Sequence, residues 1–128
     1  RWYGITQTSI GRASETELIK NNDQIAETLE NYLFANGLTD EIMNSIEEFH
    51  LWLRNHLVLT KNLIPHNLVL KKENDEIVIK IIDGLGSQAF IPLPNYFNLF
   101  AKRYVERRIE LMWRRINWDL SGRKGNWK

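Results

Sequence analysis

A chain of 128 residues, 43% of them hydrophobic, is long enough to bury a core and is expected to form a single domain. It has no cysteine, which excludes disulfide frameworks and thiolate zinc sites, and its apolar runs are far shorter than the roughly 20 residues that cross a bilayer. The net charge is +1, but residues 102–128 carry nine Lys or Arg against three Asp or Glu, so basic residues gather at the C-terminal end.

The first segment, residues 1–22, shows no sustained periodicity and many turn formers, which predicts irregular structure or short strands. It also lacks a basic head followed by an apolar stretch, so no export signal is visible and we expect a cytoplasmic protein without membrane contact. The chain does not begin with Met, which favours a piece of a longer polypeptide.

Two helices are predicted next. Apolar residues recur every three to four positions over 23–36, and Gly37 supplies a left-handed stop, so the first helix is expected there. Thr39 can cap a second helix, expected at 39–58. The short connection between them predicts an antiparallel pair. The apolar stripe of the second helix consists of Ile42, Ile46, Phe49, Leu53 and Leu57.

The pattern then changes to strands. Two aliphatic runs on either side of Asn74-Asp75 predict a β-hairpin at about 67–82, and a long helix is expected at 95–118, followed by a flexible tail at 121–128. The predicted fold class is therefore α+β, mainly α, in a single domain. The predicted core contains Leu29, Ile46, Phe49, Leu53, Ile79, Ile81, Ile109 and Met112.

The loop before the hairpin matches the catalytic loop of protein kinases. That loop reads H-R-D-L-x-x-x-N, in which the Asp accepts the substrate proton and the Asn binds magnesium. Residues 60–67 read Thr-Lys-Asn-Leu-Ile-Pro-His-Asn, which places Asn62 at the catalytic Asp and Asn67 at the metal-binding Asn. The second strand ends in Asp83-Gly84, where a kinase has the Asp of D-F-G. Asn67 and Asp83 are therefore the predicted ligands for magnesium and ATP.

Each of these features also has an ordinary explanation, since Asp-Gly after a strand is commonly a turn and an Asn before a strand commonly bonds to backbone. Their joint order indicates a protein-kinase-like C-terminal lobe. The departures from an active kinase are serious: Asn62 cannot serve as a carboxylate base, Thr60 and Lys61 replace His-Arg, and Leu85 stands where D-F-G has glycine. Residues 1–40 show neither a Gly-rich lid nor a phosphate-anchoring Lys. We expect weak binding of ATP and magnesium, and lean against an enzyme.

The same residues resemble the YrbL family of PhoP regulatory network proteins. The resemblance covers Leu59–Ile116, with the Thr-x-x-Leu-x-Pro-x-Asn loop, the Phe-Ile-Pro-Leu segment at 90–93 and a long helix rich in Arg and aromatics, and extends to Thr28–Leu33. It implies a kinase-like fold in a bacterial cytoplasmic protein tied by name to the PhoP magnesium-response network, with no assigned reaction. Because the kinase elements that precede this lobe are not visible in the chain, the expected partner is an unknown protein or a missing N-terminal lobe.

A second hypothesis uses the basic C-terminal helix. Arg103, Arg107 and Arg114 are expected on one exposed face, with Trp127 available for stacking, so the helix could contact nucleic acid or an acidic protein. The isoelectric point of about 8.2 lies below the value above 9 that is typical of strongly basic nucleic-acid binders, so nucleic acid ranks second. A basic helix face is more often simply solvated, and Glu106 and Glu110 stand at helical spacing from these arginines, so local ion pairs on a solvated face are the expected alternative to a partner.

Other motifs carry no function. Residues 84–89 match G-x-G-x-x-A, but Pro92 and Pro94 prevent the long helix that a dinucleotide site needs directly afterwards. None of the three histidines stands in an H-E-x-x-H spacing, and no G-x-S-x-G elbow occurs. These patterns argue against a dinucleotide site, zinc catalysis and a serine hydrolase.

Overall fold

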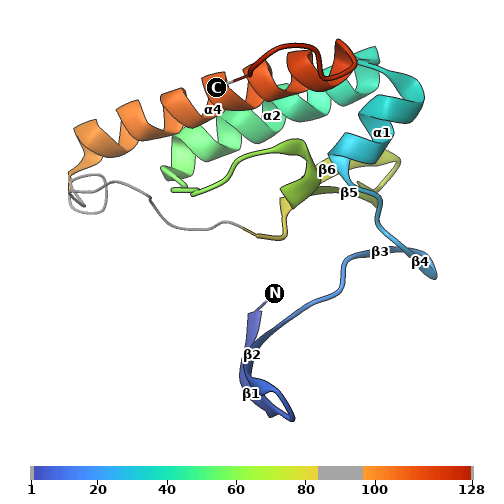
Figure 1. The fold of residues 1–128 in the computed structure, drawn as a ribbon, viewed down its shortest axis with the longest axis vertical. Coiled ribbons are helices and arrows are strands. Elements are labelled where there is room, and N and C mark those ends of the chain that lie inside the picture. Colours follow the sequence, from blue (N-terminus) through green and yellow to red (C-terminus); the bar gives the residue numbers. More distant parts are fainter. Residues whose placement is uncertain (1, 84–96, 128) are drawn as a thin grey trace.

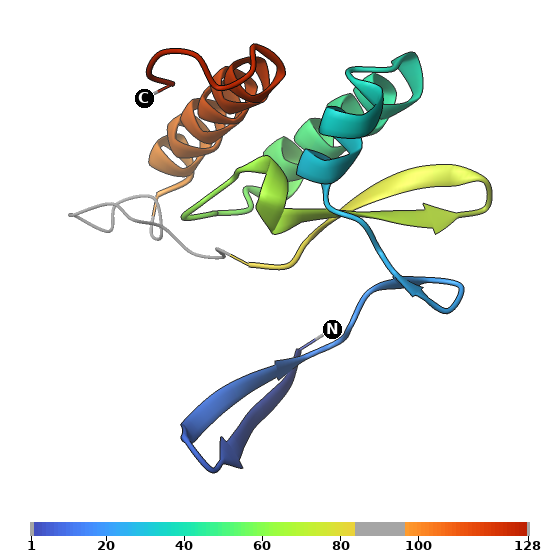
Figure 2. The same cartoon turned by 45° about the vertical axis from the view of Figure 1, so that its right-hand side comes forward.

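The computed structural model describes residues 2–83 and 97–127. Figures 1 and 2 show a body of helices lying over the hairpin β5–β6, with the hairpin β1–β2 set apart from that body. In chain order the elements are β1 (Trp2–Thr8), β2 (Gly11–Thr16), β3 (Lys20–Asn21), β4 (Gln24–Ile25), α1 (Leu29–Asn36), α2 (Asp40–His56), the 3-10 turn η1 (Pro65–Asn67), β5 (Leu68–Glu73), β6 (Glu76–Ile81) and α4 (Asn98–Leu120).

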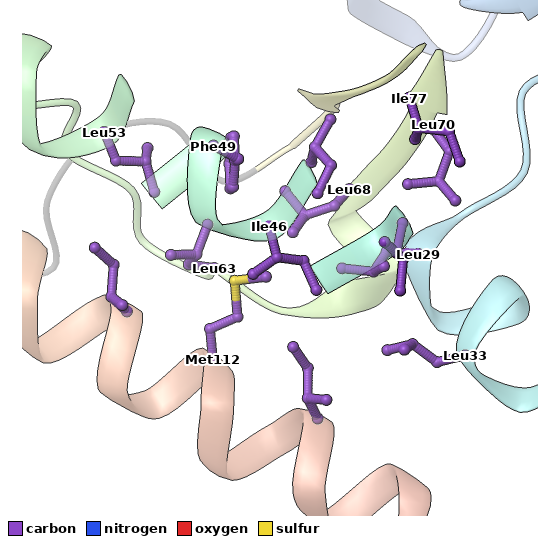
Figure 3. Packing of buried hydrophobic residues seen from close by; sticks show 14 of the residues in the cluster. Leu29, Leu33, Ile46, Phe49, Leu53, Leu63, Leu68, Leu70, Ile77 and Met112 are labelled. Carbon is purple, nitrogen blue, oxygen red and sulfur yellow. The ribbon is translucent and has the colours of Figure 1, made fainter. Parts of the chain in front are cut away.

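One hydrophobic core joins the helices to β5 and β6 (Figure 3). Of the eight predicted core residues, seven are buried, and Ile81 is half-buried and packs against the cluster. The predicted α+β class, mainly helical, is confirmed. Each of these elements contributes residues to the core: Leu29 and Leu33 from α1, Ile46 and Leu53 from α2, Leu68 and Ile79 from the hairpin, and Ile109 and Met112 from α4.

The first helix begins at Leu29, so the predicted start at residue 23 is wrong. Asn22 has a φ of 53° in the turn between β3 and β4, and the chain stays extended up to Thr28. The amide of Leu70 donates to the carbonyl of Glu27, and Thr28 forms a bridge with Val69, so these residues pair with β5 instead of coiling. Thr28 then caps α1, with its hydroxyl accepting from the amide of Asn31.

The second helix is close to its predicted range. The Thr39 hydroxyl accepts from the amide of Ile42 at 3.3 Å, and Leu57 ends the helix in the left-handed conformation. The helices α1 and α2 follow each other through a short turn, and each packs against α4. The predicted pair is therefore part of a three-helix arrangement in the described residues.

The helices α2 and α4 run antiparallel to each other (Figure 1). Arg54, near the end of α2, forms two hydrogen bonds with Glu106, near the start of α4, at 2.7 and 3.1 Å. One turn earlier on α2, His50 contacts Met112. These two contacts, one charged and one buried, add to the core packing between the two helices.

The predicted hairpin is confirmed over β5 and β6. Leu68 pairs with Ile81 at one end, and Glu73 pairs with Glu76 at the other. Between them, Asn74 and Asp75 both have positive φ, the conformation that a two-residue hairpin turn requires and that Asn and Asp tolerate. The hairpin buries Leu68, Leu70, Ile77 and Ile79.

The N-terminal segment forms two successive strand pairs, so of the two predicted possibilities short strands are correct. The register of β1 and β2 shifts between Trp2 and Gly4, and Gly4 takes a φ of 136° that a glycine adopts easily. Tyr3, Ile5 and Ile10 are all exposed.

The last helix extends to Leu120, two residues beyond its predicted end; the predicted start at 95 lies outside the described residues. After it, residues 121–127 turn back along α4, and Nε1 of Trp118 donates to the carbonyl of Gly125 at 2.7 Å. That the tail is flexible stays a prediction. None of the described helices has the length and apolar character needed to cross a membrane.

Candidate functional site

The residues of the Leu-x-Pro-x-Asn sequence hold the loop between α2 and β5 in place. Leu63 and Ile64 are buried, with Leu63 in the core cluster, and Pro65 opens the 3-10 turn, where its fixed φ suits the first position. At the start of the loop, the hydroxyl of Tyr104 on α4 donates to the carbonyl of Thr60 at 3.0 Å. The loop is thus anchored by apolar burial and by α4.

Asn67 closes this loop on itself. Its Nδ2 donates to the main-chain oxygen of Asn62 at 3.0 Å, and its own amide donates to the carbonyl of Ile64 at 3.0 Å. The residue is 7% exposed. Because Nδ2 of Asn67 donates this hydrogen bond, Oδ1 is the side-chain atom of Asn67 that can act as a ligand.

The structure brings the backbone of Asp83 to the same end of the hairpin as Asn67. The amide of Ile82 donates to the carbonyl of Asn67 at 3.0 Å, which continues the ladder one step beyond the Leu68 and Ile81 pair. Asp83 is the next residue and is exposed. The side chain of Asn62 is exposed on the adjoining loop, while its carbonyl oxygen serves the hydrogen bond to Asn67.

The protein supplies few charged ligands at this end of the hairpin. No group of three or more His, Asp or Glu in the described parts of the chain could hold a metal ion. One carboxylate and one amide oxygen suit a magnesium ion that keeps several waters and takes phosphate oxygens, and they do not suit an all-protein cage. Leu85 and the Gly84–Ala89 motif lie outside the described residues.

The basic residues predicted to bind a partner are all exposed on α4. Arg114 pairs with Glu110 one turn away, as the spacing predicted, at 2.5 Å. Glu106 pairs across the helices with Arg54 instead, and the hydrogen bond from Arg54 lowers the pKa of Glu106. In the parts of the chain that the structure describes, Arg103 and Arg107 have no ion-pair partner.

The sequence did not reveal a cluster of charged residues where α1, η1 and the end of α4 meet. Arg115 and Arg123 both contact Asp119, four residues from each, and both contact Glu30. The spacing of Arg115, Asp119 and Arg123 was a readable signal for helical ion pairs. Glu30 could not be found in this way because it lies 85 positions from Arg115.

A groove of about 520 Å³ lies between α2 and β6. Its walls include Phe49 and Trp52 of α2 and Ile79 and Ile81 of β6, and none of the predicted site residues lines it. The predicted ligands and the apolar groove are therefore separate features of the described structure.

A family model for the PhoP regulatory network protein YrbL matches residues 1–117. Comparison with curated proteins and with solved structures found no significant match. The matched range includes the β1–β2 hairpin, the anchored loop with Asn62 and Asn67, the hairpin β5–β6 and most of α4. The chain therefore belongs to the YrbL family of PhoP regulatory network proteins.

Proposed function

We propose that the chain is a degenerate kinase-like C-terminal lobe that binds a magnesium nucleotide weakly through Asn67 and Asp83 and has a regulatory or scaffold role. The observation that carries the proposal is the closed loop: Asn67 is nearly buried, fixed to Asn62, and bonded through its carbonyl to the residue before Asp83. The hydrogen bond from Ile82 places the residue before Asp83 beside Asn67, so the two proposed ligands come from neighbouring points at one end of the hairpin.

The arrangement supports metal binding that depends on phosphate. Mg²⁺ prefers six oxygen ligands and is commonly held by one or two protein groups with water and substrate phosphates. Asn67 and Asp83 would supply two protein groups of this kind, one amide oxygen and one carboxylate. Magnesium alone should therefore bind weakly, and a nucleotide should raise its affinity.

The same arrangement disfavours efficient phosphoryl transfer. Asn62 stands where a kinase has its catalytic Asp, and an amide cannot take the proton of an attacking hydroxyl. Positioning and electrostatics still contribute to phosphoryl transfer without a base. Asn62→Asp restores a carboxylate at this position, and a rise in ATP turnover would indicate a site that is otherwise competent, whereas an inert variant would indicate a scaffold.

The test is calorimetric titration of Mg-ATP into the polypeptide that contains the chain. Asp83→Ala should weaken binding by about tenfold or more, because the only proposed carboxylate ligand is removed. Asp75→Asn is the control, since Asp75 is an exposed carboxylate in the turn at the opposite end of the same hairpin and Asn tolerates its positive φ. Equal affinity of the wild type and Asp83→Ala would exclude the metal site.

A second candidate is binding of an anionic partner by α4. The supporting observation is that Arg103 and Arg107 are exposed and have no ion-pair partner in the described residues. An acidic protein is the first choice, and nucleic acid the second. Binding to RNA or DNA that falls steeply with salt, and that is lost on reversing these two charges, would favour nucleic acid.

A further inference from the structure

The charged cluster at the end of α4 connects three parts of the chain. Glu30 lies in the first turn of α1, and its Oε1 accepts from Arg115 at 3.1 Å and from Arg123 at 2.9 Å. Asp119 accepts from Arg115 at 3.0 Å through one oxygen and from Arg123 at 3.1 Å through the other. Two guanidinium groups thus bridge two carboxylates that come from opposite ends of the sequence.

Burial makes this cluster different from a surface ion pair. The side chain of Asp119 is fully buried, and those of Arg115 and Glu30 are 12% and 18% exposed. A buried carboxylate is costly unless its oxygens are hydrogen-bonded and its charge is paired, and removal of one partner leaves that charge uncompensated. Arg123, at 45% exposed, is the only member of the cluster in the segment that follows α4.

Backbone and aromatic contacts hold Arg123 in position. The amide of Arg123 donates to the main-chain carbonyl of Trp118 at 2.9 Å, and the amide of Gly122 donates to the main-chain carbonyl of Asp119 at 3.1 Å. These two bonds close the end of the helix. The guanidinium of Arg123 lies 5.1 Å from the ring of Phe34 and 5.5 Å from that of Trp118. Such cation–π contacts add to the ion pairs.

The cluster reaches the loop that carries the candidate site. Nδ1 of His66 lies 3.9 Å from the same Oε1 of Glu30 that accepts from both arginines, and His66 directly precedes Asn67. At the other end of the loop, Tyr104 of α4 holds Thr60. The helix α4 therefore bonds to the start of the loop through Tyr104, packs against η1 at its end, and through Arg115 holds Glu30 beside His66.

We propose that residues 115–127 form a latch that fixes the loop 60–67, with Arg123 as a positioning residue for Asn67 that acts through Glu30. Arg115 and Glu30 lie within the residues that the family model matches, whereas Asp119 and Arg123 lie beyond them, so the latch extends past that match. Displacement of residues 121–127 from Glu30 and Asp119 would then loosen the loop 60–67. The effect on ligand binding rests on the proposed function; the effect on the loop does not.

The experiment is NMR hydrogen exchange of the protein without ligand. In Arg123→Gln, the loop amides of Ile64 and Asn67 should exchange about tenfold faster, while the amides of β6 keep their wild-type rates. Arg114→Gln is the matched control, because Arg114 lies on the same helix and pairs with one exposed acid. Arg123→Lys keeps the charge but cannot reach both carboxylates as a guanidinium does, so an intermediate rate is expected.

Unchanged exchange of Asn67 in Arg123→Gln would overturn the latch, and so would an equal increase throughout β6, which marks global unfolding. Mg-ATP titration of the same variants separates the two proposals. If the wild type binds no nucleotide, the proposed function fails and exchange alone decides the latch. If the wild type binds and Arg123→Gln loosens the loop without lowering affinity, the positioning role of Arg123 is wrong.

Discussion

Nδ2 of Asn67 and the main-chain oxygen of Asn62 are joined by a hydrogen bond of 3.0 Å across the loop between α2 and β5. The donor is a side-chain amide and the acceptor is a carbonyl that also receives the amide of Ile64 at 3.1 Å. The loop therefore needs a donor at position 67. A carboxylate there could still bind a metal, but it could not close the loop.

Asn67→Asp should accordingly destabilise the protein by about 1–3 kcal/mol at neutral pH, because an ionised carboxylate would face the carbonyl of Asn62. The loss should shrink in acid, where a protonated Asp can donate. Urea unfolding at several pH values measures both effects. Asn44→Asp, at an exposed position of α2, should change stability by at most about 0.5 kcal/mol. Equal stability of Asn67→Asp and wild type would show that the bond is dispensable.

Leu53→Ala should lower the free energy of unfolding by about 2–5 kcal/mol, because Leu53 is 1% exposed and lies in the core between α2 and its neighbours. Leu51, two residues earlier, is 56% exposed and provides the control. Thermal or urea denaturation of both alanine variants gives the comparison. A transition midpoint unchanged in Leu53→Ala would contradict the placement of Leu53 in a well-packed core.

His50 should make the protein less stable in mild acid. Burial, followed by the charge of Arg54, lowers the pKa of His50 from 6.5 to about 4. Below pH 6.5 the unfolded chain therefore binds more protons than the folded one, and stability falls as the pH decreases towards about 4. The full loss is on the order of 3 kcal/mol.

His50→Gln removes the titrating group, so stability between pH 6.5 and about 4 should depend less on pH in this variant. His56→Gln, at an exposed position near the end of α2, serves as the control for replacing a histidine on this helix. A slope in His50→Gln equal to that of wild type would assign the acid sensitivity to other groups.

Reversal of charge at Arg103, Arg107 and Arg114 together should leave folding largely intact. All three are exposed, and an exposed ion pair such as Arg114–Glu110 contributes at most about 1 kcal/mol. Circular dichroism and denaturation of the triple Glu variant test this, and binding of an anionic partner should be lost in the same protein. Unfolding of the triple variant would show that the basic face is part of the fold.

The sequence was most informative where a local rule sets the structure. Thr39 and Gly37 mark helix ends through their own side chain or backbone freedom, and Asn74-Asp75 mark a turn that requires positive φ. The start of α1 was predicted wrongly because Ile25 fits the helical periodicity, although it is 67% exposed in β4. Pairing of residues 27 and 28 with β5 decides that start, and such pairing is not visible in local sequence.

The same distinction applies to the site. The short spacing from Asn62 to Asn67 allowed the loop to be predicted, and pairing of the two strands carries Asp83 to it. The cluster around Asp119 depends on Glu30, which only the packing of α1 against α4 brings near. Contacts between distant segments are where the sequence alone was insufficient.

The most direct test of the site is paramagnetic broadening of amide NMR signals by Mn-ATP, because Mn²⁺ takes the same oxygen ligands as Mg²⁺. The six residues of β5 separate the two ends of the hairpin by roughly 20 Å at about 3.3 Å per residue, which the distance dependence of broadening resolves easily. We expect the signals of Asn67, Leu68 and Ile82 to broaden first and those of Asn74 and Asp75 to persist. Broadening that begins at the turn, or that reaches no residue of the hairpin at saturating Mn-ATP, would contradict a metal site at Asn67 and Asp83.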